Sequence, residues 1–337
     1  MKKFLIKLSY TVLPLWLAVL ALVCYVTLYI SPKISGDLGR LAYIPFGQEY
    51  DRMIEAQAMT DTLFTTIRQT EQLRTLHVDV LTVGDSFSQQ ANGGYQNYLP
   101  GRGLTVANCF RKLYASPLQY ASNLLDQGVI DSTNVKVLLV EIAERDFLSC
   151  FQEFREDKVE VPSPATGEKV SNEWSLMRSR DFVLYRIGYD CPVYTAQLDR
   201  DYFTSDEPRK LYFYYADVDN GVNIGQQNEA QVKAIFDLMC RKAASRGVFF
   251  MLMVAVDKYD VYQTHIVGNA YPAKTVNEEL TQMLGQSPSL FLCKPYLKPL
   301  VDQGEKDVFL FNNTHWTPKA SEAIGNALSD RLSEVLP

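Results

Sequence analysis

The chain has 337 residues, 47% of them hydrophobic, and a formal net charge of −6. This length allows one large domain with an anchor, or two domains, and the hydrophobic content is enough for a substantial core. The basic residues form no long run, which argues against a nucleic-acid partner because phosphate contacts need clustered lysine and arginine. The chain has only three histidines and no cysteine pair with the spacing of a zinc site, so we expect no metal and no cofactor.

The N-terminus predicts a membrane anchor. Three lysines within the first eight residues precede an apolar stretch at 10–30, which is long enough to cross a bilayer as a helix. Because basic residues favour the cytoplasmic side, we expect 1–8 to be a cytoplasmic tail and 9–30 a single-pass helix in the inner membrane, with the rest of the chain periplasmic or otherwise extracytoplasmic. A cleaved signal peptide is the alternative, but its apolar core is usually shorter, and residues 29–32 form a poor cleavage site.

The hydrophobic pattern divides the remaining chain. Residues 31–75 predict a juxtamembrane stem with a helix-prone run at 51–76, and 76–337 alternate between strand-like and helix-like runs. The strand-like runs are 77–84, 104–109, 135–142, 248–256 and 307–311. The helix-like runs are 117–128, 228–246 and 317–336. This alternation predicts an α/β domain with a three-layer, doubly wound and mostly parallel sheet.

A region at about 151–227 interrupts this pattern and predicts an insertion that is charged and rich in tyrosine. Its aromatic side chains could line a sugar cleft, because aromatic rings stack on sugar faces, or they could pack an irregular subdomain. Cys150 and Cys191 flank part of this region and could form a disulfide, whereas we expect Cys109 and Cys240 to be buried thiols.

Two motifs far apart in this domain suggest a nucleophile and its base. The Gly-Asp-Ser-Phe motif at 84–87 follows the apolar run 78–83, so Ser86 lies where a strand meets a helix-prone stretch. That geometry exposes a hydroxyl and directs main-chain N–H groups at whatever the hydroxyl attacks. His315, in the Thr-His-Trp motif at 314–316, is a candidate for the base that a serine needs to become a nucleophile.

Two further segments follow strand-like runs. An acidic block with an arginine lies at 140–146, and the segment 256–262 resembles a Pro-x-Lys-x-x-x-Tyr pattern with Val256 in place of proline. In order and spacing, these segments and the two motifs resemble the SGNH hydrolase superfamily over about 76–337. More narrowly, they are similar to its membrane-anchored branch that acylates cell-envelope polysaccharides, the alginate O-acetyltransferase type and its DHHW relatives. The resemblance implies an SGNH, flavodoxin-like fold.

The resemblance also implies catalytic roles. His315 would take the proton from Ser86, and Ser86 would attack an acyl donor to form an acyl-enzyme. A sugar hydroxyl, or water in an esterase, would then attack that intermediate. The tetrahedral oxyanion would be held by the Ser86 N–H and by Asn108, which stands where the superfamily places its second donor.

Two cations have alternative roles under this resemblance. Arg145 could donate to the oxyanion or bind an anionic substrate, or it could form a salt bridge to Glu141 or Glu144. Lys258 could bind a uronate or a phosphate, or it could be a solvated lysine.

The histidine motif departs from the family in one respect. The family has an acidic residue two or three positions before the histidine, where this chain has Asn312 and Asn313. An asparagine carbonyl holds an imidazole tautomer but does not stabilise imidazolium, and the corresponding aspartate-to-asparagine change in a serine protease lowers kcat by about 10⁴. Three possibilities follow: a serine–histidine dyad assisted by Asn313, an acid from elsewhere with Asp307 and Asp257 as candidates, or weak or lost catalysis.

We therefore expect extracytoplasmic transfer of an O-acyl group, such as acetyl, to a cell-envelope or exported polysaccharide. A carbohydrate acetylesterase and a degenerate polysaccharide-binding or scaffold protein are the alternatives. Because a domain outside the membrane has no direct access to cytoplasmic acyl-coenzyme A, we also expect a multi-span membrane acyltransferase as a partner.

Overall fold

The computed structural model describes residues 2–131, 133–159 and 176–336, and its core is a central β-sheet. The sheet has six strands in the order β1-β3-β2-β4-β7-β8, and every neighbouring pair is parallel. Its strands are β1 Thr65–Ile67, β2 Val80–Gly84, β3 Val106–Cys109, β4 Val137–Ala143, β7 Phe249–Ala255 and β8 Leu290–Leu292. The expected α/β class with a mostly parallel sheet is confirmed.

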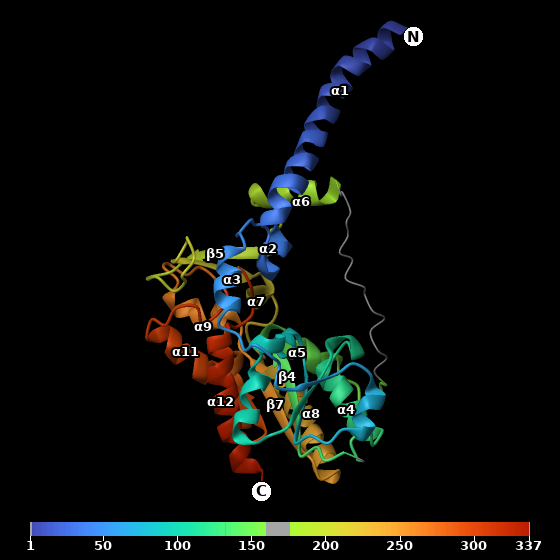
Figure 1. The fold of residues 1–337 in the computed structure, drawn as a ribbon, viewed down its shortest axis with the longest axis vertical. Helices are drawn as coiled ribbons and strands as arrows, with labels where there is room; N and C mark the ends of the chain where they lie inside the picture. The colour runs from blue at the N-terminus through green and yellow to red at the C-terminus, as the bar shows by residue number, and fades with distance from the viewer. Residues whose placement is uncertain (1, 132, 160–175, 337) are drawn as a thin grey trace.

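Helices cover both faces of the sheet, so the strands are buried on both sides and read as continuous apolar runs. Alternate residues of β4 enter different cores: Val137 and Leu139 pack in the core that includes α12 residues, whereas Leu138 and Val140 pack in the core that includes α4 and α8 residues. Figure 1 shows α4 and α8 on one side of β4 and β7, and α11 and α12 on the other. The covering helices are α4 Pro117–Asp126, α5 Glu144–Glu153, α8 Gln226–Ser245, α9 Lys258–Tyr262, α10 Val276–Leu284, α11 Lys294–Asp302 and α12 Pro318–Val335.

The strand order explains where a site can form. The five strands from β3 to β8 have the doubly wound order 2-1-3-4-5 when numbered along the chain, with the change of direction between β2 and β4. Ligands of such sheets bind outside the carboxyl ends of the strands at this switch point. The Gly-Asp-Ser-Phe motif follows β2 and the acidic block ends β4, so both lie at the switch point.

The stretch expected as a stem differs from the prediction in its secondary structure. It forms α2 Gly36–Ala42 and α3 Glu49–Glu55, then β1 and the short 3₁₀ helix η3 Thr70–Thr75, rather than one helix over 51–76. The β-branched residues of β1 pair with β3 and make β1 an edge strand of the sheet, which overrides the helical spacing of the surrounding apolar residues. The run 307–311 is not a strand of the sheet either, because it makes only an isolated bridge between Phe309 and Trp316.

The N-terminal helix projects from the body of the protein (Figure 1). It comprises α1 Lys2–Tyr25, a π-helical turn η1 Val26–Ile30 and a 3₁₀ turn η2 Ser31–Lys33. The segment Val12–Lys33 is long and apolar enough to cross a membrane. Many of its large apolar side chains are exposed, Trp16 by 61% and Leu28 by 68%, as expected of a helix that has no protein core around it.

The region at 151–227 adds a small two-stranded sheet beside the base of this helix. Its described elements are α6 Leu176–Arg186, β5 Val193–Gln197, β6 Lys210–Tyr214 and α7 Ala216–Asp219, with β5 and β6 antiparallel. Tyr202 and Tyr212 are buried, so these two pack in the core rather than line a sugar cleft. Cys150 and Cys191 are both free thiols, and Cys109 is buried whereas Cys240 is partly exposed.

Candidate active site

The turn that carries Ser86 is fixed by its neighbours. Ser86 begins the 3₁₀ helix η4 Ser86–Gln89, directly after β2. The Asp85 carboxylate accepts a hydrogen bond from Phe87 N at 3.2 Å and another from Ala143 N at 2.6 Å. Asp85 therefore caps the turn and attaches it to the end of β4, which holds Ser86 in place over the sheet.

Glu141 supports the same turn from β4, a role that the sequence analysis did not assign. Its carboxyl accepts from Ser88 N at 3.1 Å and from Ser88 Oγ at 2.8 Å, and it is fully buried. Burial, and then the nearby charge of Asp85, raise the pKa of the Glu141 carboxyl well above its usual value. Position 84 must be glycine here, because an added Cβ would lie 2.2 Å from Ser88 Oγ and 2.5 Å from Glu141 Oε2.

His315 lies in the loop before α12, and its ring is oriented by Asn313. His315 Nδ1 donates to Asn313 Oδ1 at 2.6 Å, which leaves Nε2 as the nitrogen that carries a lone pair. Nε2 is buried, and it has no hydrogen-bond partner in the part of the chain that the structure describes. This is the tautomer that a general base needs.

The two motifs meet although they are distant in sequence. The Phe87 ring lies 5.0 Å from the His315 ring and 4.7 Å from the Trp316 ring, between centroids. Gln90 Nε2 donates to Trp316 O at 2.8 Å. The structure thus places His315 beside the Ser86 turn with Nε2 not yet bonded to Ser86, and catalytic hydrogen bonds of this kind often form only with substrate present.

A carboxylate from the stem region lies next to the histidine. Asp37 Oδ2, in α2, is 3.5 Å from His315 Nδ1. The Asp37 carboxylate also accepts from Thr314 N at 2.9 Å and from Thr314 Oγ1 at 2.5 Å. Burial alone would raise the pKa of the Asp37 carboxyl, but its interactions with His315 and Thr314 outweigh burial and lower that pKa. No sequence signal pointed to Asp37, since it lies 277 positions before Thr314 and outside every motif.

The two expected alternative acids, Asp257 and Asp307, bind other groups in this structure. The Asp257 carboxylate is fully buried and binds Arg145 at 2.8 Å and Lys274 at 2.6 Å. Asp307 accepts hydrogen bonds from Tyr50 Oη at 3.0 Å and from Thr204 Oγ1 at 2.8 Å. Neither carboxylate has an ion pair with His315 among the described residues, whereas Asp37 has one.

Arg145 forms its main salt bridge with Asp257, which was not among its expected partners. Its guanidinium binds Asp257 rather than Glu141 or Glu144, and lies 3.5 Å from Asp217. The side chain is only 10% exposed, and the guanidinium carbon is 5.9 Å from the centre of the Phe87 ring. Arg145 therefore packs under the Ser86 turn, and its contact with an oxyanion or a substrate stays a prediction.

Like Arg145, Asn108 uses its polar side-chain atoms to bind other residues of the protein. Its side-chain amide donates to Ser88 O at 2.9 Å, and its carbonyl accepts from the Thr82 hydroxyl at 2.7 Å. These bonds attach β3 to the turn after Ser86. The proposed role of Asn108 as an oxyanion donor stays a prediction.

Lys258 is not a solvated lysine, and its contact with a substrate stays a prediction. The side chain is completely buried at the start of α9. Its Nζ donates to the main-chain oxygens of Leu310, Phe311 and Asn313, at 2.8, 2.9 and 3.3 Å. Lys258 therefore holds the loop that carries the histidine, and in its protonated form the group has three donors for the three carbonyls.

We expect Lys258 to make stability depend on pH. Burial lowers the pKa of its amino group to about 7, against the opposing charges of Asp37, Asp217 and Asp307. The usual pKa of a lysine amino group is 10.5. Between about pH 7 and pH 10.5, Lys258 is therefore protonated in the unfolded chain and neutral in the folded chain. The free energy of unfolding should therefore rise with pH across this window, by up to about 1.4 kcal/mol per pH unit from this group.

Denaturant unfolding of the full-length chain at about pH 7 and about pH 9 tests this expectation. The rise in stability should be smaller in Lys258→Met than in the wild type. Lys233→Met, which replaces an exposed lysine of α8, serves as the control and should keep the wild-type rise. Equal rises in the wild type and Lys258→Met would show that Lys258 stays charged in the folded state.

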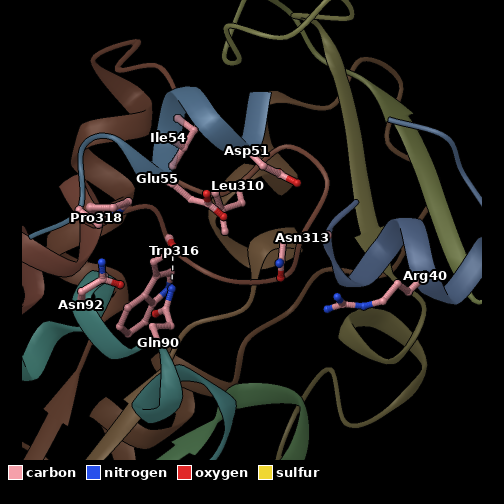
Figure 2. Close-up of a pocket in the computed structure, with 13 residues that line it drawn as sticks. Arg40, Asp51, Ile54, Glu55, Gln90, Asn92, Leu310, Asn313, Trp316 and Pro318 are labelled. Carbon is pink, nitrogen blue, oxygen red and sulfur yellow. Dashed lines mark hydrogen bonds between the residues drawn. The ribbon is translucent and has the colours of Figure 1, made fainter. Parts of the chain in front are cut away.

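A cavity of about 350 Å³ opens between the stem helices and the histidine loop. Figure 2 shows Arg40 of α2 pointing toward the side where Asn313 lies, with Gln90 bonded to Trp316 below. Asp51 and Glu55 of α3 line the wall above Gln90 and Trp316 in this view (Figure 2). The lining also includes polar and charged side chains, which could fix the orientation of a ligand by hydrogen bonds. Ser86 and His315 are not part of the lining themselves.

Comparison with known families finds a match for the C-terminal part of the chain. Residues 210–337 match the family model described as the SGNH hydrolase-like domain of acetyltransferase AlgX. None of the curated proteins compared with the chain matches it. The matched part contains Lys258 and His315, and such a domain indicates an enzyme of the acyltransferase or esterase type. This part of the chain is therefore similar to the SGNH hydrolase-like domain of acetyltransferase AlgX, which confirms the resemblance to the alginate O-acetyltransferase branch.

Proposed function

We propose that this protein transfers an acetyl or related acyl group to an extracytoplasmic polysaccharide through a Ser86 acyl-enzyme. The observation that carries this proposal is the state of His315, whose Nδ1 is bound by Asn313 and whose buried Nε2 has no partner among the described residues. A base prepared in this way beside a serine turn is the arrangement that acyl transfer needs.

The reaction would proceed in two halves. His315 Nε2 takes the proton of Ser86 Oγ as the oxygen attacks the carbonyl carbon of the donor. The tetrahedral intermediate collapses, the leaving group receives that proton, and Ser86 keeps the acyl group as an ester. A sugar hydroxyl then gives its proton to His315 and attacks the ester, which releases the acylated sugar and restores the Ser86 hydroxyl.

The N-terminal helix supports an extracytoplasmic location. It is long and apolar enough to cross a membrane, and the three lysines near its start favour a cytoplasmic N-terminus. The domain would then lie outside the inner membrane, without direct access to cytoplasmic acyl-coenzyme A. A multi-span membrane acyltransferase would deliver the acyl group, and the anchor would keep Ser86 near that partner at a high effective concentration.

Cells that lack the gene test the proposal. The ester content of the exported or cell-envelope polysaccharide should fall, and the wild-type gene should restore it while Ser86→Ala should not. Replacing residues 1–30 with a cleavable signal peptide should also lower the ester content, because the domain would leave the membrane. A rise in ester content on deletion would instead identify an esterase, and no change would favour a non-catalytic binding protein.

A further inference from the structure

The acid position of this site is divided between two residues from opposite ends of the chain. Asn313 makes the short bond to His315 Nδ1, at 2.6 Å, but carries no charge. Asp37 Oδ2 lies 3.5 Å from the same nitrogen and carries the charge. Among the described residues, 2–131, 133–159 and 176–336, no other carboxylate forms an ion pair with His315.

Several contacts hold Asp37 at this distance. Thr314, the residue before the histidine, donates both its N–H and its hydroxyl to the Asp37 carboxylate. Leu38 N donates to Asn312 O at 3.2 Å, so the main chain of α2 is bonded directly to the histidine loop. The Asn312 amide donates in turn to Asp51 Oδ1 at 2.7 Å, which adds α3 to the same attachment.

The close approach of the two main chains depends on a glycine. Gly36 has a φ of +69°, and a Cβ there would lie 2.1 Å from Asn312 O. Because the next residue is Asp37, the contact between Gly36 and Asn312 sets the position of the carboxylate. This contact brings the negative charge of Asp37 close to the histidine.

We propose that Asp37 is a positioning residue that completes the catalytic triad from the segment after the membrane anchor. Asn313 fixes the tautomer of His315, and Asp37 stabilises the imidazolium that forms when His315 accepts the Ser86 proton. This inference rests on the proposed function, since it assigns a role within the same proton transfer. It also means that the site is complete only when α2 is docked on the histidine loop.

Exchanging the position of the charge tests this role. The full-length chain in detergent micelles would be assayed for p-nitrophenyl acetate turnover and for the rate of labelling by a fluorophosphonate. Asp37→Asn should lower kcat and the labelling rate by about 10²-fold with little change in KM; the loss is smaller than the about 10⁴-fold of a directly bonded carboxylate because Asn313 still holds the tautomer. Adding Asn313→Asp to Asp37→Asn should restore most of the activity, because the charge returns to Nδ1.

The controls separate charge from folding. Asp61→Asn makes the same exchange at an exposed position between α3 and β1 and should behave as the wild type. Wild-type rates in Asp37→Asn would overturn the inference. A loss that Asn313→Asp does not rescue, with a lowered melting temperature, would also overturn it, because Asp37 would then only hold the loop. A wild-type chain that is not labelled at Ser86 would refute the proposed function and this role together, whereas labelling of wild type and Asp37→Asn at equal rates would refute this role alone.

Discussion

Replacing Ser86 by alanine should lower p-nitrophenyl acetate turnover by about 10⁴-fold or more and abolish labelling by a fluorophosphonate. His315→Ala should lower turnover to a similar extent, because a serine hydroxyl without a base is a poor nucleophile at neutral pH. The double variant should be no worse than either single one, since the two groups act together in one proton transfer. Turnover and labelling of the full-length chain in detergent measure all three variants.

The histidine assignment has a matched control within the chain. His77, just before β2, is exposed, so His77→Ala should keep wild-type turnover and labelling. Melting temperatures near the wild-type value would show that the active-site variants remain folded. Full labelling of Ser86→Ala would mean that another residue is the nucleophile, and full turnover by His315→Ala would mean that another group is the base.

Gly36→Ala should lower both stability and activity strongly. An alanine at a φ of +69° is strained, and its Cβ would lie 2.1 Å from the main-chain oxygen of Asn312. Because a main-chain oxygen cannot rotate away, α2 must move off the histidine loop and take Asp37 with it. We expect a loss of about 3 kcal/mol in unfolding free energy and a loss of turnover of about 10²-fold, as for a missing carboxylate.

Gly47→Ala is the control for this prediction. Gly47 lies in the same segment and has a φ of +80°, but an added Cβ would meet nothing within 4 Å. Both variants carry the cost of a left-handed alanine, about 1 kcal/mol, and only Gly36→Ala carries the clash. Denaturant unfolding and turnover compare the two, and equal losses would show that the contact between α2 and Asn312 is not what positions the site.

The sequence allowed the centre of the fold to be predicted because its signals are local. The apolar runs of β2, β4 and β7 are buried on both faces, so each is recognisable without knowledge of its neighbours. The turn at Ser86 and the helix α12 are also recognisable from local sequence. In α12, Pro318 opens the helix and Thr317 caps it. The strand β8 was missed because its three residues are too few to show a pattern.

The partners of the charged residues could not be predicted in this way. Lys258 and Asp257 stand side by side in one segment, yet Lys258 binds the histidine loop and Asp257 binds Arg145 and Lys274. These pairings depend on how distant segments pack, and nothing in the local spacing encodes them. Asp37 is the clearest case, because its function is defined only by a loop that lies near the other end of the chain.

The short connection between the N-terminal helix and α2 limits where the reaction can happen. The apolar segment ends at Lys33, and Asp37 follows four positions later, a distance of at most about 14 Å even for extended chain. If the helix crosses the membrane as proposed, a docked Asp37 would therefore keep His315 close to the lipid head groups. Under the proposed function, such a site would be closer to a polysaccharide that leaves the same membrane than to one that is already free in the periplasm. Acyl transfer would then take place at the membrane surface, while the polymer is being exported.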